Sequence, residues 1–105
     1  MSQGSKTPNS EYKIPILQVL TDFGGRGKVK EILERVYEKM KDVLNSFDLE
    51  VLSSGFDVRW RNAAQWARNS LVRDGLMKSD SPRGVWEISE AGRQWLAKSS
   101  RARAK

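Results

Sequence analysis

The side chains that most often perform acid–base or nucleophilic chemistry are missing from this sequence, which contains neither His nor Cys. Imidazole catalysis, thiolate nucleophiles, disulfides and the usual zinc sites are therefore excluded. A metal-dependent nuclease needs an Asp and a Glu-x-Lys on neighbouring strands to hold a divalent ion. The one Glu-x-Lys here, Glu11-Tyr12-Lys13, opens a helical pattern with no Asp upstream, so chance explains it best. We predict no enzyme, no metal site and no cofactor.

The side chains that could instead read DNA gather in residues 59–76, RWRNAAQWARNSLVRDGL. The helical repeat of 3.6 residues puts Ala64, Ala67 and Leu71 on one face, where small residues allow close packing. Amide and guanidinium side chains are the groups that read base edges. On the opposite face they are supplied by Gln65, Asn69 and Arg73. This segment is expected to be the recognition helix of a DNA-binding domain.

Both ends of that helix carry local signals. Asn62 can cap the start, with Gln65 three residues later able to return a hydrogen bond. Gly75 supplies the stop. We therefore predict a helix over residues 63–74.

Positive charge is concentrated in the second half of the chain. Residues 1–58 hold 8 Lys/Arg and 9 Asp/Glu, a net charge of −1, whereas residues 59–105 hold 11 and 4, a net charge of +7. Residues 59–100 alone still carry +4, so a basic tail is not the whole source. Such a field favours a polyanionic partner and speeds its capture.

The first half of the chain reads as a disordered leader, two helices and a linker. Residues 1–10 are polar and lack apolar periodicity. Apolar residues at helical spacing predict a helix over 11–23, ended by Gly24-Gly25, and a second from Gly27-Lys28 to Leu44. The periodicity then fails over 45–58, a linker long enough to be either functional or mobile.

The second half adds a hairpin and a last helix. Residues 76–78 and 85–88 are short β-prone runs joined by a Pro/Gly/Ser/Asp turn. Ser89 can cap a helix from Glu90 to about Lys98, followed by a basic tail, 99–105. The order predicts an α+β, mainly α fold: a winged helix-turn-helix over residues 11–98, with three helices, a β-hairpin wing and a C-terminal helix.

Five segments share their residues with one protein family: 59–76, 79–92 (SDSPRGVWEISEAG), 14–17 (IPIL), 24–25 (GG) and 48–50 (DLE). They resemble the N-terminal domain of Mrr-type restriction proteins, over roughly residues 11–97. That resemblance implies a winged-helix domain of prokaryotic, modification-dependent restriction endonucleases, which join it to a nuclease domain of the PD-(D/E)xK type. The nuclease motif is absent here. The implied role is target recognition on double-stranded DNA, with modified bases as an option and a nuclease domain in cis or in trans.

The candidate contacts on the recognition helix each have an ordinary alternative. For Arg59 and Arg61 we favour DNA over salt bridges to the acidic first half. Capping explains Asn62 fully, so base reading comes second there. Gln65 and Asn69 could bind adenine or could be ordinary polar surface.

Three further side chains lie at the edges of this face. Arg73 more naturally offsets the helix dipole than reads a base. Arg68 leans toward the buried side. Trp66 either stacks on nucleic acid or packs under the 45–58 linker, and we expect packing.

A second group of candidates flanks the helix. In the wing, Arg83 beside Gly84 is placed to enter a minor groove or meet phosphate. Lys78 and Ser81 are candidate phosphate donors. At the start of the second helix the same role falls to Lys28 and Lys30, because helix N-termini favour phosphate. Trp86 is expected in the core.

Two interpretations remain beside DNA binding. Winged helices also serve as protein docking or dimerisation modules, so a homodimer is an open option. A hydrolytic enzyme is disfavoured by the missing residues. The lack of Cys and of an apolar leader or membrane span predicts a cytoplasmic protein, associated with the nucleoid if DNA is the partner.

Overall fold

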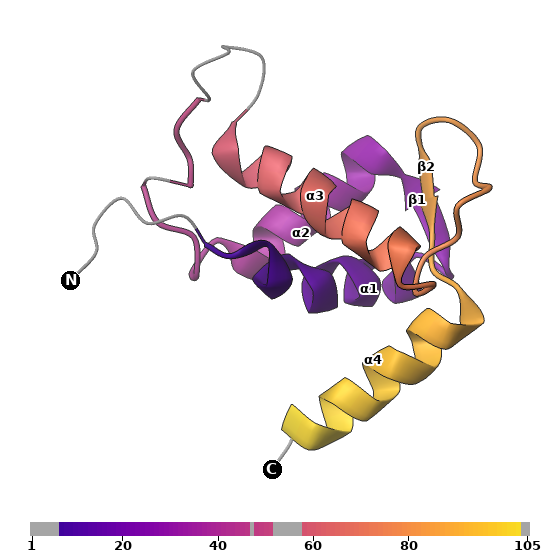
Figure 1. Cartoon of the computed structure of the whole chain (residues 1–105). Coiled ribbons are helices and arrows are strands. Elements are labelled where there is room, and N and C mark those ends of the chain that lie inside the picture. The colour runs from indigo at the N-terminus through magenta and orange to yellow at the C-terminus, as the bar shows by residue number, and fades with distance from the viewer. Residues whose placement is uncertain (1–6, 47, 52–57, 104–105) are drawn as a thin grey trace.

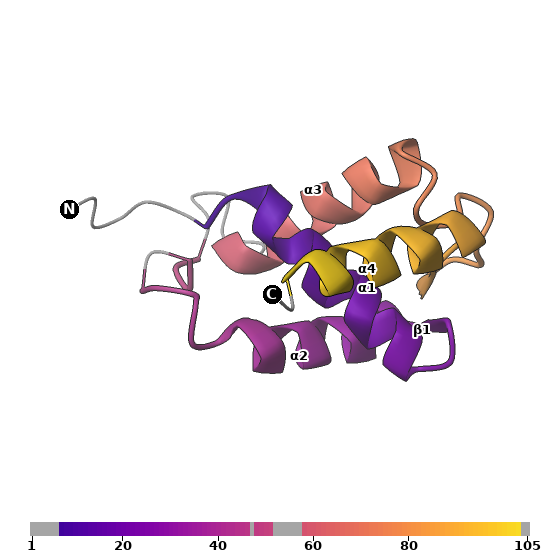
Figure 2. The same cartoon turned by 90° about the horizontal axis from the view of Figure 1, so that it is seen from below.

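The computed structural model describes residues 7–46, 48–51 and 58–103. Its elements, in chain order, are a 3₁₀ helix η1 (Asn9–Tyr12), α1 (Lys13–Asp22), β1 (Arg26–Lys28), α2 (Val29–Met40), α3 (Arg59–Arg73), β2 (Val85–Glu87) and α4 (Glu90–Arg103). Figure 1 shows α3 on the upper side of the molecule and α4 on the lower side. In Figure 2, α1 lies between α2 and α3.

The core forms where these three helices turn their apolar faces toward one another. Ile16 and Leu20 of α1, Ile32 and Val36 of α2, and Leu71 of α3 are fully buried. Each such side chain contributes about 1.5–3 kcal/mol by leaving water. On α3 the small side chains of Ala64 and Ala67 are buried as well, as the helical spacing predicted, and Ala63 is buried beside them.

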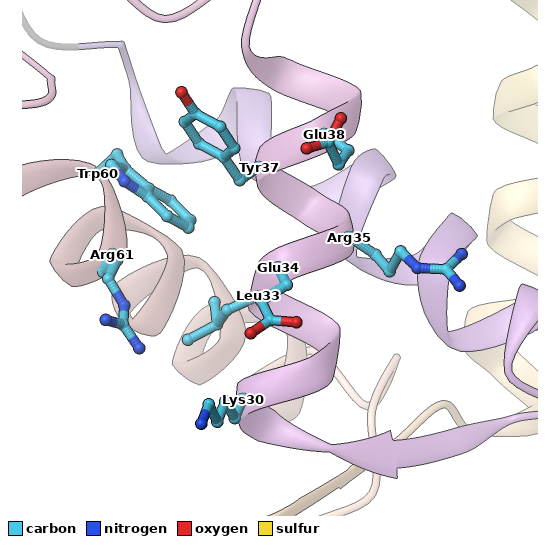
Figure 3. Close-up of a pocket in the computed structure, with 8 residues that line it drawn as sticks. All are labelled: Lys30, Leu33, Glu34, Arg35, Tyr37, Glu38, Trp60 and Arg61. Carbon is cyan, nitrogen blue, oxygen red and sulfur yellow. The ribbon is translucent and has the colours of Figure 1, made fainter.

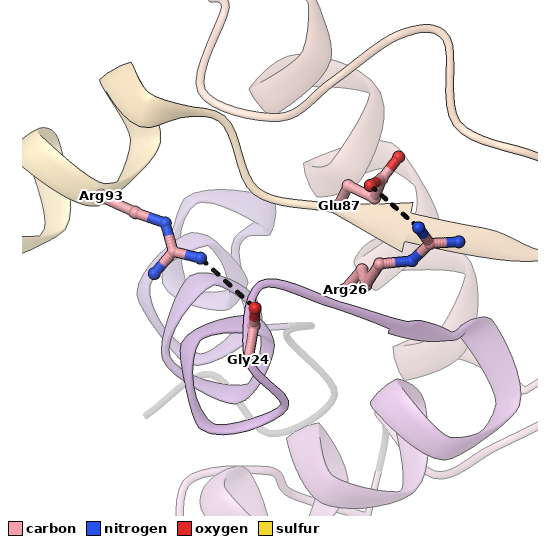
Figure 4. A network of polar contacts seen from close by, with 4 residues as sticks. All are labelled: Gly24, Arg26, Glu87 and Arg93. Atoms are coloured by element: carbon pink, nitrogen blue, oxygen red, sulfur yellow. Dashed lines mark hydrogen bonds and ion pairs between the residues drawn. The ribbon is translucent and has the colours of Figure 1, made fainter.

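The sheet differs from the expected hairpin. β1 pairs antiparallel with β2, with Gly27 opposite Trp86, so the segment expected to open the second helix is a strand and α2 begins at Val29. Gly27 suits this place because a Cβ there would lie 2.8 Å from Phe23 Cδ2. An ion pair spans the two strands, with Arg26 Nη1 3.8 Å from Glu87 Oε2 (Figure 4). Trp86 is buried, as expected.

The expected pairing of residues 76–78 with 85–88 is present in reduced form. Met77 and Ile88 make an isolated antiparallel bridge, and the Lys78 N–H donates to the Glu87 carbonyl at 2.9 Å. The wing is therefore a β2 strand flanked by β1 and by this short segment. The mainly helical α+β, winged-helix-like fold class is confirmed.

Several helix limits differ from the predicted ones. The first helical segment starts as η1 at Asn9, and α2 ends at Met40 rather than Leu44. α4 continues to Arg103, into the expected tail. Residues 7–10 also differ from the expected leader, because Thr7 is only 7% exposed. Residues 1–6 of that leader lie outside the described residues.

The start of α3 corrects the prediction for Asn62. The helix begins at Arg59, with Val58 as its N-cap residue and no side-chain cap. The N–H groups of Arg59 and Trp60 donate instead to the carbonyls of Glu50 and Asp48, both at 2.8 Å. Asn62 lies inside the first turn, so it is not the cap. Because backbone carbonyls of the preceding segment accept the first N–H groups of α3, the helix needs no side-chain cap.

A buried carboxylate fixes the segment that supplies those carbonyls. Asp48 is 1% exposed. Its Oδ1 accepts the Thr7 N–H at 2.7 Å, and its Oδ2 accepts the Thr7 hydroxyl at 2.7 Å and the Asn45 N–H at 3.0 Å. Burial opposes ionisation, but these donors and the nearby Arg59 offset it, so the pKa of Asp48 lies below its usual value.

The other end of α3 follows the predicted local signals. Gly75 has φ +79°, the Leu76 N–H donates to the Leu71 carbonyl, and the Gly75 N–H donates to the Val72 carbonyl. This is the Schellman arrangement. Ser89 Oγ accepts the Gly92 N–H at 3.0 Å, which confirms its capping of α4, and donates to the Gly75 carbonyl at 2.6 Å.

Arg93 ties α4 back to the turn after α1. Its Nη2 donates to the Gly24 carbonyl at 3.5 Å (Figure 4). Gly24 and Gly25 both have positive φ, as expected of residues that end a helix. The turn also meets the wing, because the Ile88 N–H donates to the Gly25 carbonyl at 2.9 Å.

Candidate nucleic-acid interface

The outward face of α3 is exposed along its length. Gln65, Asn69 and Arg73 are all exposed, as is Arg61 one turn earlier. The face is turned outward because the alanines and Leu71 on the other side are packed on α1 and its neighbours. A row of amide and guanidinium groups therefore reaches solvent along α3. Figure 1 shows this helix on the upper side of the molecule.

Trp66 belongs to this exposed face, and the expectation that it packs under the linker is wrong. Its side chain is 58% exposed. Trp60, six residues earlier on the same helix, is 8% exposed and packs in the core. Residues 52–57 of the linker lie outside the described residues.

Two arginines at the edges of the face are held by neighbours. The Arg68 guanidinium carbon lies 5.9 Å from the centre of the Trp86 ring, and Arg68 Nη1 donates to Asn69 Oδ1 at 3.4 Å. As expected, Arg68 covers the edge of the core. Arg73 Nη2 donates to Ser70 Oγ at 2.8 Å in the last turn, where a positive charge also offsets the helix dipole.

The structure favours the ordinary alternative for Arg59. Its Nη2 lies 3.9 Å from Glu50 Oε1, so it pairs with the acidic first half of the chain. The Arg59 side chain is 25% exposed. The ion pair is the alternative to the DNA contact predicted at this position, and it replaces that prediction for Arg59. Asn62, with its capping role removed, is half-buried at the edge of the outward face.

A basic corner forms beside α3 where β1 meets the wing. Lys28 lies opposite Val85 in the strand register, and the Val29 N–H donates to the Gly84 carbonyl at 2.9 Å. This pairing brings Lys28 and Lys30 to the same corner as Arg83, across more than fifty residues of chain. All three side chains are exposed. We call Lys28, Lys30 and Arg83 the wing corner.

The other two wing candidates differ in accessibility. Lys78 is exposed. Ser81 is half-buried, and its Oγ is enclosed without a hydrogen-bond partner. In this arrangement the Ser81 hydroxyl does not face a phosphate outside the wing.

A groove of about 570 Å³ lies between α2 and α3, and no pattern in the sequence predicts it. Figure 3 shows the Tyr37 and Trp60 rings at one end, with centroids 5.5 Å apart, and Lys30 at the other. Leu33 and Arg61 also line it, with the carboxylates of Glu34 and Glu38. Helical spacing shows that Leu33 and Tyr37 are apolar positions of α2, but it does not show which neighbouring helix they face.

Other site types find little support in the described part of the chain. Residues 7–46, 48–51 and 58–103 contain no group of three or more His, Cys, Asp or Glu side chains placed to hold a metal ion. Among the same residues, no helix is both long and apolar enough to cross a membrane.

Comparison with known proteins gives one match. The model of the Mrr N-terminal domain matches residues 10–98. Searches of curated proteins and of solved structures found no match. Because the matched span is most of the chain, the protein belongs to the Mrr N-terminal domain family.

Proposed function

We propose, from the protein's membership in the Mrr N-terminal domain family, that it binds double-stranded DNA as the target-recognition part of a restriction system. The nuclease activity of such a system would then come from another domain or another chain. The observation that carries the proposal is the uncovered outward face of α3, beside the wing corner.

The dimensions of α3 suit the major groove of B-DNA. That groove is about 12 Å wide and admits an α-helix. The fifteen residues of α3 include amides at Gln65 and Asn69, which can pair with adenine, and guanidiniums at Arg61 and Arg73. Because α3 begins four residues before the predicted start, its first turn adds Asn62 to the side chains that can approach a base.

The distribution of charge predicts how a bound duplex lies across the protein. Exposed carboxylates follow one another along α2: Glu31, Glu34 and Glu38, the last two lining the groove beside α3. Phosphates beside the later turns of α2 are repelled by these groups, whereas phosphates near the wing corner, at the first turn of α2, are attracted. A duplex is therefore expected to cross α3 toward the wing, with Lys28, Lys30, Lys78 and Arg83 on its backbone.

Binding of duplex DNA at several salt concentrations tests the proposal. Arg61→Ala with Arg83→Ala should weaken binding and lower the slope of log affinity against log salt by about 1, because Arg83 is the one of the two placed on phosphate and each phosphate contact contributes about 0.9. Lys39→Ala with Lys98→Ala removes the same charge from exposed positions elsewhere and is the matched control. An unchanged affinity in the first variant, or an equal loss in both, would overturn the proposed interface.

The groove between α2 and α3 supports a second candidate, a protein docking module. Its Tyr37–Trp60 pair and Leu33 offer apolar surface that a partner segment could cover. A docking module should show no salt-sensitive DNA affinity beyond that of a peptide with the sequence of residues 99–105. Stronger binding by the whole chain than by this peptide would favour DNA.

A further inference from the structure

Trp66 places an indole on the outward face of α3, among polar side chains. It is 58% exposed, and the core on the other side of the helix is completed by Trp60, the alanines and Leu71. Single exposed apolar residues are common on protein surfaces. This one lies on the face that the proposed function directs into the major groove.

Amides lie on both sides of the indole along the helix. Asn62 is four residues before Trp66 and Asn69 three residues after it, and such neighbours have Cβ atoms about 5–6 Å apart. The Arg68 guanidinium donates to Asn69 Oδ1 at 3.4 Å, so this amide lies beside a positive charge. The three side chains therefore form one short ridge: amide, indole, amide.

The major groove offers one kind of apolar group to such a ridge. Base edges there carry hydrogen-bond donors and acceptors, except for the methyl group on C5 of thymine. 5-Methylcytosine carries a methyl group on the same C5 atom. An indole beside an unmethylated pyrimidine would exclude water from polar edges without replacing their hydrogen bonds, whereas a methyl group gives it an apolar contact.

We infer that Trp66 is a specificity residue that contacts the C5-methyl group of a pyrimidine in the major groove. The flanking amides would bind the neighbouring base edges. This inference rests on the proposed function, since it requires α3 to enter the groove of a duplex.

Three duplexes of one mixed sequence test the inference by fluorescence anisotropy. The first contains thymine, the second has deoxyuridine in place of thymine, and the third adds 5-methylcytosine to the second in place of cytosine. The wild-type chain should bind the first more tightly than the second by about fourfold for each methyl group contacted. Recovery of affinity with the third would identify 5-methylcytosine as a second source of the methyl group.

Trp66→Ala should abolish the difference in affinity between the thymine and deoxyuridine duplexes and leave the salt dependence of binding unchanged, because the indole carries no charge. Because Trp66 is largely exposed, the variant is expected to fold, and unchanged circular dichroism would establish that. Trp66→Phe should keep part of the preference. Gln65→Ala, an exposed neighbour, is the matched control and should lower affinity for the thymine and deoxyuridine duplexes equally.

The outcomes separate this inference from the function on which it rests. A wild-type chain that binds all three duplexes equally, or a Trp66→Ala variant that keeps the thymine preference, overturns the inference and leaves DNA binding intact. A wild-type chain that binds none of them overturns both.

Discussion

The two ends of α3 are held in different ways. At the C-terminal end, Gly75 reverses the chain direction and its carbonyl accepts a hydrogen bond from Ser89 Oγ. The hydrogen bonds at this end join residues at most fourteen apart. At the N-terminal end, the helix is held by carbonyls of residues 48 and 50, which are fixed in turn by Thr7 on the buried Asp48. The C-terminal end follows from nearby sequence, whereas the N-terminal end depends on the hydrogen bonds between Thr7 and Asp48, which join residues 41 apart and form only in the folded chain.

This difference predicts where the proposed interface is most easily damaged. The amides of α3 point outward only if the helix keeps its position and phase. Loss of the N-terminal anchor should disturb Arg61, Asn62 and Gln65, whereas loss of the C-terminal stop should disturb Arg73 and the entrance to the wing.

The largest effect is expected from Asp48→Ala, at about 2–4 kcal/mol of the free energy of unfolding. The substitution removes a buried carboxylate and leaves the N–H groups of Thr7 and Asn45 without their acceptor. Glu50→Ala is the matched control, because it removes only a partly exposed ion pair and keeps the backbone carbonyl. It should cost about 0.5 kcal/mol or less. Urea unfolding measures the loss of unfolding free energy in both variants. Similar losses would show that the buried carboxylate does not anchor the N-terminal end of α3.

The same anchor predicts a dependence on pH. Because the pKa of Asp48 is lower in the folded chain than its unfolded value of 3.8, its charge stabilises the fold above that value. The stabilisation is lost as the pH falls through the folded-state pKa. The difference in unfolding free energy between wild type and Asp48→Asn should therefore be constant near neutrality and shrink below pH 3.8. A difference that stays constant in acid would show that the carboxylate charge does not matter.

At the C-terminal end, Gly75→Ala should cost about 1–2 kcal/mol. No atom lies within 4 Å of the position that a Cβ would take, so the cost comes from the backbone at φ +79° rather than from a clash. Gly75→Asn should cost less, since Asn adopts this conformation more readily. Thermal unfolding compares the two, and equal losses would argue for a contact rather than backbone strain.

Ser89→Ala should cost about 1 kcal/mol, the usual value of a lost N-cap. Its Oγ joins the start of α4 to the end of α3, so hydrogen exchange should rise at Gly92 and in the last turn of α3. Ser89→Thr keeps the hydroxyl and serves as the control. An increase in hydrogen exchange confined to α4 would show that the hydrogen bond from Ser89 to Gly75 does not stabilise the end of α3.

The smallest effect is expected from Asn62→Ala, within about 0.5 kcal/mol. Asn62 is inside the first turn and Ala has the higher helix propensity, so the change can even stabilise the chain. A loss of about 1 kcal/mol or more would restore Asn62 as a cap and would question the start of α3 at Arg59.

Much of the fold could be predicted because its signals are local. Helical spacing predicted the buried alanines and Leu71 of α3, and the residue types predicted Gly75 as a stop and Ser89 as a cap. Trp66 was predicted wrongly. Spacing correctly placed it away from the core of α3, but which distant segment would cover that position depends on the path of the linker.

By itself, the sequence determined which face of α3 is apolar, which face carries amides and guanidiniums, and that positive charge gathers in the second half. These properties depend on side chains a few residues apart. Only the tertiary structure decided that α3 begins at Arg59 and that Lys28 and Lys30 meet Arg83 at one corner. The helix start depends on backbone carbonyls, which every residue possesses and no residue type marks. The corner depends on a strand pairing between residues nearly sixty apart, whose partners are fixed when the core closes.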